Sequence, residues 1–431
     1  MHNILLKSER KMPLLTNPHI TANSFLTITD SSADEAEPIL LFFIPGNPGL
    51  ISYYNAYLSL LSSNLSSIAS ASDTNSNKGS IPQCIIHGKS MGGFEILEDD
   101  MSRSSVLSST SSMSQNRTGE GKSQSQSQSH ATDPKLYSLF EQIEFVYRNL
   151  KDFVAAWHEN LQLQLHKKKN KSDDDQNGEK RGEGGRNVKV ILIGHSVGAY
   201  ISMEILRRHT ETKKTTPIGN AGAMDIIGGI LLFPTIVDIA KSSAGRKLTK
   251  LLYMPYLALL TSLLVKLLVY ILPGSVLRSI VAMVMVSPPE DAIDITIAFL
   301  KSRQGVEQAI HMSADEMRDI TSDKWSDEIW GIASSSTESS TSTSTPTNSS
   351  PDLVLYFAQS DHWVADQTRE DIIRARGSMG NGTSNAPRMH VCEDGVVHGF
   401  CIRHSDIMAE KTAGFLRDII RKRYRIVRAS H

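Results

Sequence analysis

The sequence has few cysteines and no excess of either charge, and both absences narrow the possible functions. Cys84, Cys392 and Cys401 are the three cysteines in 431 residues, and none of their spacings is that of a zinc motif. This sparse, odd set argues against a disulfide framework and fits a reducing compartment. Lys and Arg number 45 and Asp and Glu 46, so no global charge points to nucleic acid. We expect no metal, no cofactor and no nucleic-acid partner.

A signal-peptide core is also lacking, and much of the chain is too polar to form a core. The apolar run near Met1 is too short for secretion to be expected. Segments rich in Ser, Gln, Asn or charge are expected to be low-complexity or disordered insertions, at 66–80, 101–133, 166–187, 333–351 and 377–387. The rest predicts one domain over 20–425, with an inserted helical region over 236–332 as a cap or docking element.

Apolar runs of strand length alternate with segments of helical periodicity. The strongest strand candidates are Ile39–Ile44, Val188–Ile193, Ile227–Phe233 and Leu353–Ala358, and shorter ones lie at 24–29, 81–86 and 389–392. Helical spacing of apolar residues covers 51–65, 136–163, 368–376 and 407–421. This alternation predicts an α/β fold with a mostly parallel sheet flanked by helices.

The strand Val188–Ile193 leads into Gly194-His-Ser-Val-Gly198 and then into a helix ending near Arg208. G-x-S-x-G between a strand and a helix is the nucleophile elbow of α/β-hydrolases. The turn is sharp, and glycine at 194 and 198 avoids Cβ atoms that would clash with the neighbouring strand and helix. Ser196 is therefore the predicted nucleophile.

A second match to the same pattern is Gly88-Lys-Ser-Met-Gly92. The residues after it, up to Asp100, lead into a long Ser/Gln tract and leave no room for the helix that an elbow requires. Ser90 is expected to lie in a loop at the carboxyl end of a strand, near the site but not reactive.

The order Ser…Asp…His asks for an acid after a later strand and a histidine beyond it. Asp361 follows the strand Leu353–Ala358, and His398 lies between the last strand and the last helix. His398 is the predicted general base and Asp361 the group that orients it. Nearby alternatives for these two roles are Asp366, His362 and His404.

An oxyanion hole is expected from two backbone N–H groups, one of them that of Val197, the residue after the nucleophile. The other should come from the loop Pro45-Gly-Asn-Pro-Gly49. Proline has no N–H, so Gly46 or Asn47 must supply it. Asn47 is favoured.

The most apolar stretch runs from Leu251 to Leu272 with a single charge, Lys266, and continues over 276–286. Its length allows a membrane span, a hairpin lying in one leaflet, or a buried helical cap over the site. A span is disfavoured because it would place two halves of one sheet on opposite sides of a membrane.

Several blocks of the sequence resemble the lipid-droplet-associated hydrolases. They are Ile44–Gly49 with the following Tyr53 and Tyr54, Gln142–Glu144, Leu192–Tyr200, Leu231–Thr235, Asp361 before Trp363, and His398–Phe400. The resemblance implies an α/β-hydrolase on the cytosolic face of lipid droplets and the endoplasmic reticulum. It also implies a role in neutral-lipid turnover, with a triad at Ser196, Asp361 and His398.

Together these observations predict a serine hydrolase that cleaves ester bonds of hydrophobic lipids, sterol esters or acylglycerols, through an acyl-Ser196 intermediate. The apolar segment 251–286 would dock it to the lipid surface. Two alternatives stay open: a non-catalytic or weakly active protein that controls droplet size or lipid storage, and a transferase that passes the acyl group to an alcohol.

Overall fold

A computed structural model describes residues 17–30, 37–72, 82–97, 135–169, 187–215, 224–332, 350–377 and 386–429. The predicted insertion 101–133 lies outside these residues, as does most of the other four. Two of the predicted insertions, 66–80 and 166–187, begin inside helices. Helix α1 (Asn55–Ser72) continues through 66–72, and helix α3 (Leu139–Lys169) continues through 166–169. In both places a helix already formed by an apolar face extends into polar sequence.

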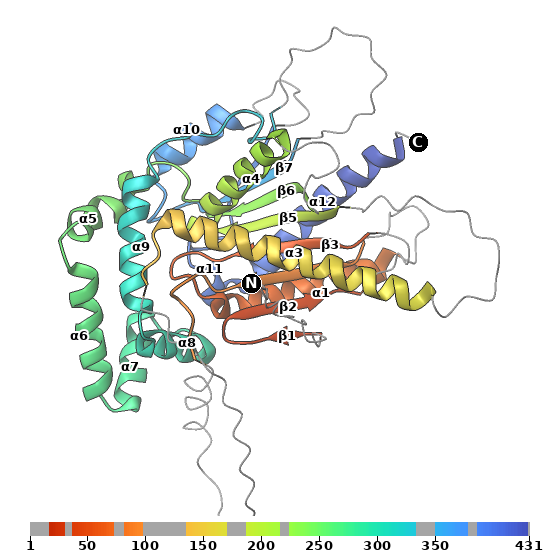
Figure 1. Ribbon diagram of the computed structural model, residues 1–431. Helices are drawn as coiled ribbons and strands as arrows, with labels where there is room; N and C mark the ends of the chain where they lie inside the picture. Colours follow the sequence, from red (N-terminus) through yellow and green to blue (C-terminus); the bar gives the residue numbers. More distant parts are fainter. Residues whose placement is uncertain are drawn as a thin grey trace, which may run out of the picture.

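The described residues form an eight-stranded sheet in the order β1-β2-β4-β3-β5-β6-β7-β8 (Figure 1). The pairings of β1 with β2 and of β2 with β4 are antiparallel, and β3 through β8 run parallel to one another. The bounds are β1 His19–Ile20, β2 Ser24–Ile28, β3 Ile39–Ile44, β4 Cys84–Lys89, β5 Val188–His195, β6 Met224–Leu232, β7 Asp352–Phe357 and β8 Arg388–Val391. The predicted α/β class and the mostly parallel sheet are confirmed.

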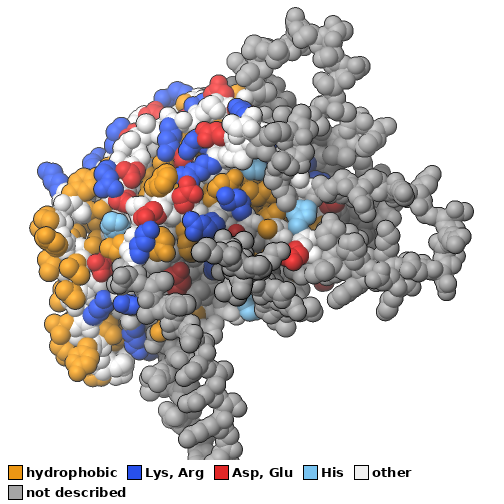
Figure 2. Space-filling view, viewed as in Figure 1, with side chains coloured by type: hydrophobic (Ala, Val, Ile, Leu, Met, Phe, Trp, Pro, Cys, Tyr) orange, Lys and Arg blue, Asp and Glu red, His pale blue; other side chains and the backbone are white. Residues whose placement is uncertain are grey.

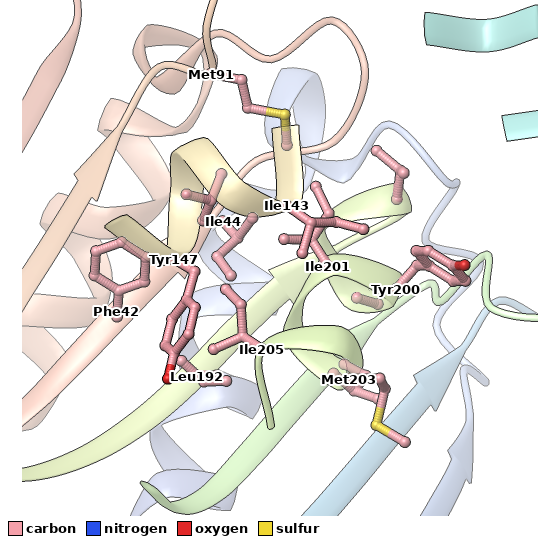
Figure 3. Packing of buried hydrophobic residues seen from close by; sticks show 14 of the residues in the cluster. Phe42, Ile44, Met91, Ile143, Tyr147, Leu192, Tyr200, Ile201, Met203 and Ile205 are labelled. Carbon is pink, nitrogen blue, oxygen red and sulfur yellow. The ribbon is translucent and has the colours of Figure 1, made fainter. Parts of the chain in front are cut away.

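Helices cover both faces of this sheet, which explains why its strands are apolar on both sides. All six residues of β3 are buried, and alternate ones enter different cores. Leu40, Phe42 and Ile44 join one core with residues of α3 and α4 (Val197–Thr215), shown in Figure 3. Ile39, Leu41 and Phe43 join the other core with residues of α1 and α12 (Ser405–Ala429).

Strand β4 lies three residues later than the sequence predicted. It pairs with β3 from Cys84 opposite Ile39 to Gly88 opposite Phe43, so the first glycine of the second G-x-S-x-G match is inside the strand. The prediction of a strand at 81–86 rested on the apolar residues of that stretch. Glycine at position 88 leaves room for the side chain of Ile51, which packs there. A Cβ at this position would lie 2.6 Å from Ile51.

A helical cap separates β6 from β7 and lies at one end of the sheet (Figure 1). It consists of η2 (Ile239–Lys241), α5 (Ser243–Leu252), α6 (Leu257–Ile271), α7 (Gly274–Val284), α8 (Glu290–Lys301) and α9 (Gly305–Asp319). Helix α9 packs against α5, α6 and α8 on the cap side and against α3 on the sheet side. It therefore connects the outer cap helices to the body of the domain.

The apolar segment is not buried, so the reading of 251–286 as a buried cap is wrong. In α6 only Ser262 is buried, and in α7 only Leu277 and Val281. No single helix in the described ranges is long and apolar enough to cross a membrane. Helices α5 and α6 together reach that length and composition, but they are bent by 94° relative to each other.

Candidate active site

Ser196 occupies the sharp turn between β5 and α4, with φ at 55°, in the left-handed region. A Cβ on Gly194 would come within 2.3 Å of the carbonyl oxygen of Gly198, and one on Gly198 within 2.3 Å of that of Ile44. The two glycines thus allow the turn to pack against the helix and against β3, as the sequence predicted.

The structure brings the side chains of Ser196, His398 and Asp361 into one hydrogen-bonded chain. His398 Nδ1 lies 2.8 Å from Asp361 Oδ2, and His398 Nε2 lies 2.9 Å from Ser196 Oγ. A carboxylate only accepts hydrogen bonds, so Nδ1 carries the imidazole proton and Nε2 accepts from the serine hydroxyl. The other carboxylate oxygen, Oδ1, accepts the backbone N–H of Trp363 at 2.8 Å, which fixes the acid in its loop after β7.

Three of the alternative residues, Ser90, Asp366 and His362, are engaged elsewhere. Ser90 is buried, and its hydroxyl accepts the N–H of Ile51 at 3.2 Å, so it ties the loop after β4 to η1 (Ile51–Tyr54). Asp366 begins α10 (Asp366–Arg376) and pairs with Arg369. The ring of His362 faces the hydroxyl of Ser243 at the start of α5.

Of the two candidates for the second oxyanion donor, the structure leaves Asn47 available. The N–H of Gly46 donates to the Tyr54 hydroxyl at 3.0 Å. Among the described residues, the backbone N–H of Asn47 has no hydrogen-bond acceptor. The N–H of Val197 is the first of α4 and has no partner within the helix. Val197 follows Ser196 in the sequence, and the loop of Asn47 lies against Ser196 in space, because a Cβ on Gly46 would lie 3.0 Å from that of Ser196.

A buried hydrogen-bond network connects the loop of Gly46 to the loop of His398. His195 Nε2 donates to the carbonyl oxygen of His398 at 2.9 Å, so its Nδ1 accepts from the Tyr54 hydroxyl at 2.7 Å. Burial, reinforced by the nearby His398, lowers the pKa of His195 well below its ordinary value. Burial likewise raises the pKa of Tyr54 well above its ordinary value. Both groups therefore stay neutral, as this pattern of donors and acceptors requires.

The side chain of Asn47 is held by the cap. Its Nδ2 donates to Glu316 Oε1 at 3.0 Å, to Ser313 Oγ at 2.9 Å and to the carbonyl oxygen of Ala309 at 3.0 Å, all on α9. Burial raises the pKa of Glu316 to about 8, with Asp315 adding to the rise and Asn47 opposing it. At neutral pH the Glu316 carboxyl is therefore mostly protonated.

A pocket of about 510 Å³ opens over Ser196 and His398. Its wall includes Asn47, Glu316 and Trp363, and near the exposed Val397 it includes Met285, which follows α7. A cavity of similar size, about 530 Å³, lies between η2 and α10 and contains none of the three hydrogen-bonded residues. In the described ranges, no group of His, Cys, Asp and Glu is arranged to hold a metal ion.

Sequence reasoning assigned no role to Tyr54, His195 or Glu316. Signals for the first two were present: the tyrosine pair after the Pro45–Gly49 loop and the histidine inside the elbow. The sequence contains no such signal for Glu316, because a single acid in an amphipathic helix usually faces solvent.

Comparisons with known proteins agree with this architecture. The family model of lipid-droplet associated hydrolases matches residues 37–401. The lipid droplet-associated hydrolase of Gallus gallus is 24% identical over 413 residues, covering 91% of this chain and 90% of that protein. The Homo sapiens protein of the same name is 24% identical over 239 residues, covering 55% and 60%.

Among solved structures, a thermophilic esterase from Thermogutta terrifontis has a TM-score of 0.40 at 11% identity, covering 92% of this chain and 93% of that chain. Juvenile hormone epoxide hydrolase from Bombyx mori has a TM-score of 0.39 at 12% identity, covering 92% and 73%. The fold is the α/β-hydrolase fold. Because the family model spans most of the sequence, the chain belongs to the lipid-droplet-associated hydrolase family.

Proposed function

We propose that this hydrolase cleaves ester bonds of hydrophobic lipids, sterol esters or acylglycerols, through an acyl-serine intermediate at Ser196. The observation that carries the proposal is the hydrogen-bonded chain from Asp361 through His398 to the Ser196 hydroxyl, with its 2.8 Å and 2.9 Å links. This is the arrangement that acyl transfer to serine needs.

In the first half of the reaction His398 takes the proton of Ser196 as Oγ attacks the ester carbonyl carbon. Asp361 stabilises the imidazolium that forms, and the proton then passes to the departing alcohol. In the second half a water molecule, deprotonated by His398, attacks the acyl carbon and releases the acid. The two unoccupied N–H groups, of Asn47 and Val197, stabilise the negative oxygen in both halves.

The cap takes part by holding the loop that carries one of these donors. Asn47 has both roles: its backbone N–H faces the reaction and its side chain is bonded to α9. Glu316 and Ser313 are positioning residues in this proposal. They keep the loop at the distance from Ser196 that preorganised stabilisation requires.

The exposed helices α6 and α7 dock the protein to the lipid surface, on the cytosolic face of droplets and the endoplasmic reticulum. Figure 2 shows hydrophobic side chains gathered at the edge of the molecule where these helices lie. We call this the apolar surface: Leu259, Leu260, Leu263, Leu264, Leu267, Leu268, Tyr270 and Ile271 of α6 with Val276, Ile280, Met283 and Val284 of α7. Water-soluble proteins rarely expose a patch of this kind without a partner.

The apolar surface also leads toward the pocket. Helix α7 ends at Val284, and the next residue, Met285, lines the wall above Ser196. Arg403 donates to the carbonyl oxygens of Met285 and Val286, which fixes this corner against α11 (Phe400–Arg403). A lipid leaving the surface would reach the serine along this apolar path.

The test is turnover by the purified full chain of sterol esters, triacylglycerols and short acyl esters, beside Ser196→Ala. We expect release of free acid from at least one hydrophobic ester and none from the variant. Equal, background release by both proteins would favour the non-catalytic droplet protein. Acyl transfer to an added alcohol in preference to water would favour the transferase.

A further inference from the structure

The charges of the cap are distributed differently from those of the whole chain. Overall, positive and negative residues are balanced, 45 against 46. Between Asp238 and Glu290, however, the sequence contains six lysines and arginines and not one Asp or Glu: Lys241, Arg246, Lys247, Lys250, Lys266 and Arg278. This interval includes the whole apolar surface.

Two of these six cations are neutralised by acids just outside the interval. Lys241 pairs with Asp238 at 2.7 Å, and Arg278 pairs with Glu290 and Asp294. Within the described part of the chain, the remaining four form no salt bridge. Lys247, Lys250 and Lys266 are also exposed to solvent. The lipid-facing side of the molecule thus carries uncompensated positive charge.

These lysines border the apolar surface. In a helix each residue turns by about 100°, so Arg246, Lys247 and Lys250 form one side of α5, and the exposed Leu251 continues that side. Lys266 lies on α6 between exposed leucines at 264 and 267. Figure 2 shows Lys and Arg side chains beside the hydrophobic ones at this edge.

We propose that the apolar surface binds a phospholipid layer that carries net negative charge, with Lys247, Lys250 and Lys266 contacting its anionic headgroups. This rests on the proposed docking through 251–286. The leucines of α6 lie between acyl chains, while the flexible lysine side chains extend to the headgroup level. Charge complementarity selects this occupant, because a purely zwitterionic layer has no net negative charge to attract the cations.

The expected size of the effect follows from the number of cations. Each Lys near an anionic surface strengthens binding about fivefold, so Lys247 and Lys250 together contribute roughly 25-fold, and Lys266 brings the total to on the order of a hundredfold. This contribution is electrostatic and weakens as salt shortens the screening length, whereas burial of leucines does not weaken in this way.

The experiment is flotation of the full-length protein with triolein droplets coated by phosphatidylcholine, or by the same lipid with a third replaced by phosphatidylserine. We expect wild type to bind the serine-containing droplets on the order of a hundredfold more tightly. The double variant Lys247→Gln/Lys250→Gln should lose most of that preference and still bind phosphatidylcholine droplets. Arg148→Gln/Lys151→Gln removes two exposed cations of α3, over the sheet, and should keep the preference.

Two results would overturn the proposal: equal binding of wild type to both kinds of droplet, or an undiminished preference in the α5 double variant. Equal binding leaves the docking role of the apolar surface intact. Absence of flotation with either droplet contradicts both the docking role and its charge selectivity. Turnover is not part of the readout, so a failure of the esterase proposal is seen separately.

Discussion

The hydroxyl of Tyr54, at the end of η1, lies 2.7 Å from Nδ1 of His195, at the end of β5. The same hydroxyl accepts the N–H of Gly46, and the other ring nitrogen of His195 donates to the carbonyl oxygen of His398. The pair therefore sets the distance between the loop of Gly46 and the loop of His398. Neither group contacts the reacting atoms, so both are positioning residues.

Replacing Tyr54 with Phe should lower kcat by about tenfold with little change in KM. The substitution leaves the buried N–H of Gly46 and Nδ1 of His195 without partners, at a cost of about 1–3 kcal/mol shared between stability and positioning. Steady-state kinetics on a short acyl ester measures the effects on kcat and KM separately.

Tyr57→Phe is the matched control. It also removes one buried hydroxyl, which donates to Thr412 of α12 at 3.0 Å. We expect about 1 kcal/mol of lost stability and an unchanged kcat. Equal losses of kcat in the two variants would show that Tyr54 acts only through stability.

Glu316 should make a contribution to the stability of the protein that falls as pH rises between about 4.5 and 8. Burial raises the pKa of this carboxyl to about 8 in the folded protein. In that interval the folded state keeps the proton and the unfolded state has lost it, so a higher pH favours unfolding. The contribution of one such group is about 1.4 kcal/mol for each pH unit and ends above the folded pKa.

Urea unfolding of wild type and Glu316→Gln at several pH values measures this contribution. The amide cannot ionise, so the free energy of unfolding of wild type relative to the variant should fall with pH over the same interval. Parallel curves would mean that Glu316 is ionised in the folded protein at neutral pH.

Gly198→Ala should destabilise the protein by about 3 kcal/mol or prevent its folding. The added Cβ would lie 2.3 Å from the carbonyl oxygen of Ile44, a backbone atom in the middle of the sheet. Gly274→Ala, at the start of α7, is the control because nothing lies within 4 Å of its Cβ. In thermal unfolding, the Tm of Gly274→Ala should equal or slightly exceed that of wild type.

Leu264→Glu/Leu267→Glu should release the protein from lipid droplets without unfolding it. Both side chains are more than half exposed, at 56% and 53%, so charge is tolerated in water but not in a lipid layer. Leu60→Glu/Leu97→Glu alters exposed leucines outside the cap and should leave droplet localisation unchanged. Microscopy of tagged proteins in lipid-loaded cells distinguishes the two. Retention of the α6 variant on droplets would contradict docking through the apolar surface.

The fold was predictable because the decisive signals are local. Strand β3 reads as a continuous apolar run, and the elbow has its strand, its glycines and its helix within a few residues. Asp361 and His398 were found through the order of the chain, since the carboxyl ends of parallel strands meet at one edge. The limits of α1 and α3 were not predictable, because polar residues can extend a helix that is anchored elsewhere.

The contacts of the cap could not be predicted from the sequence. That Asn47 bonds to Glu316 depends on how α9 packs over the loop, 269 residues away in the chain. A hydropathy pattern likewise cannot tell whether Leu264 faces a core or the surface, because both environments favour the same residues in a lipid-associated helix. Only the packing of α6 on α9 decides it.

The most direct test of the catalytic assignment is labelling of the purified protein with a fluorophosphonate probe, followed by mass spectrometry of the labelled peptide. We expect a single adduct on Ser196 that is lost in Ser196→Ala. It should be kept in Ser90→Ala, because the hydroxyl of Ser90 in wild type accepts the N–H of Ile51. Labelling that persists in Ser196→Ala, or that wild type fails to show under conditions that label a known serine esterase, would contradict the catalytic assignment.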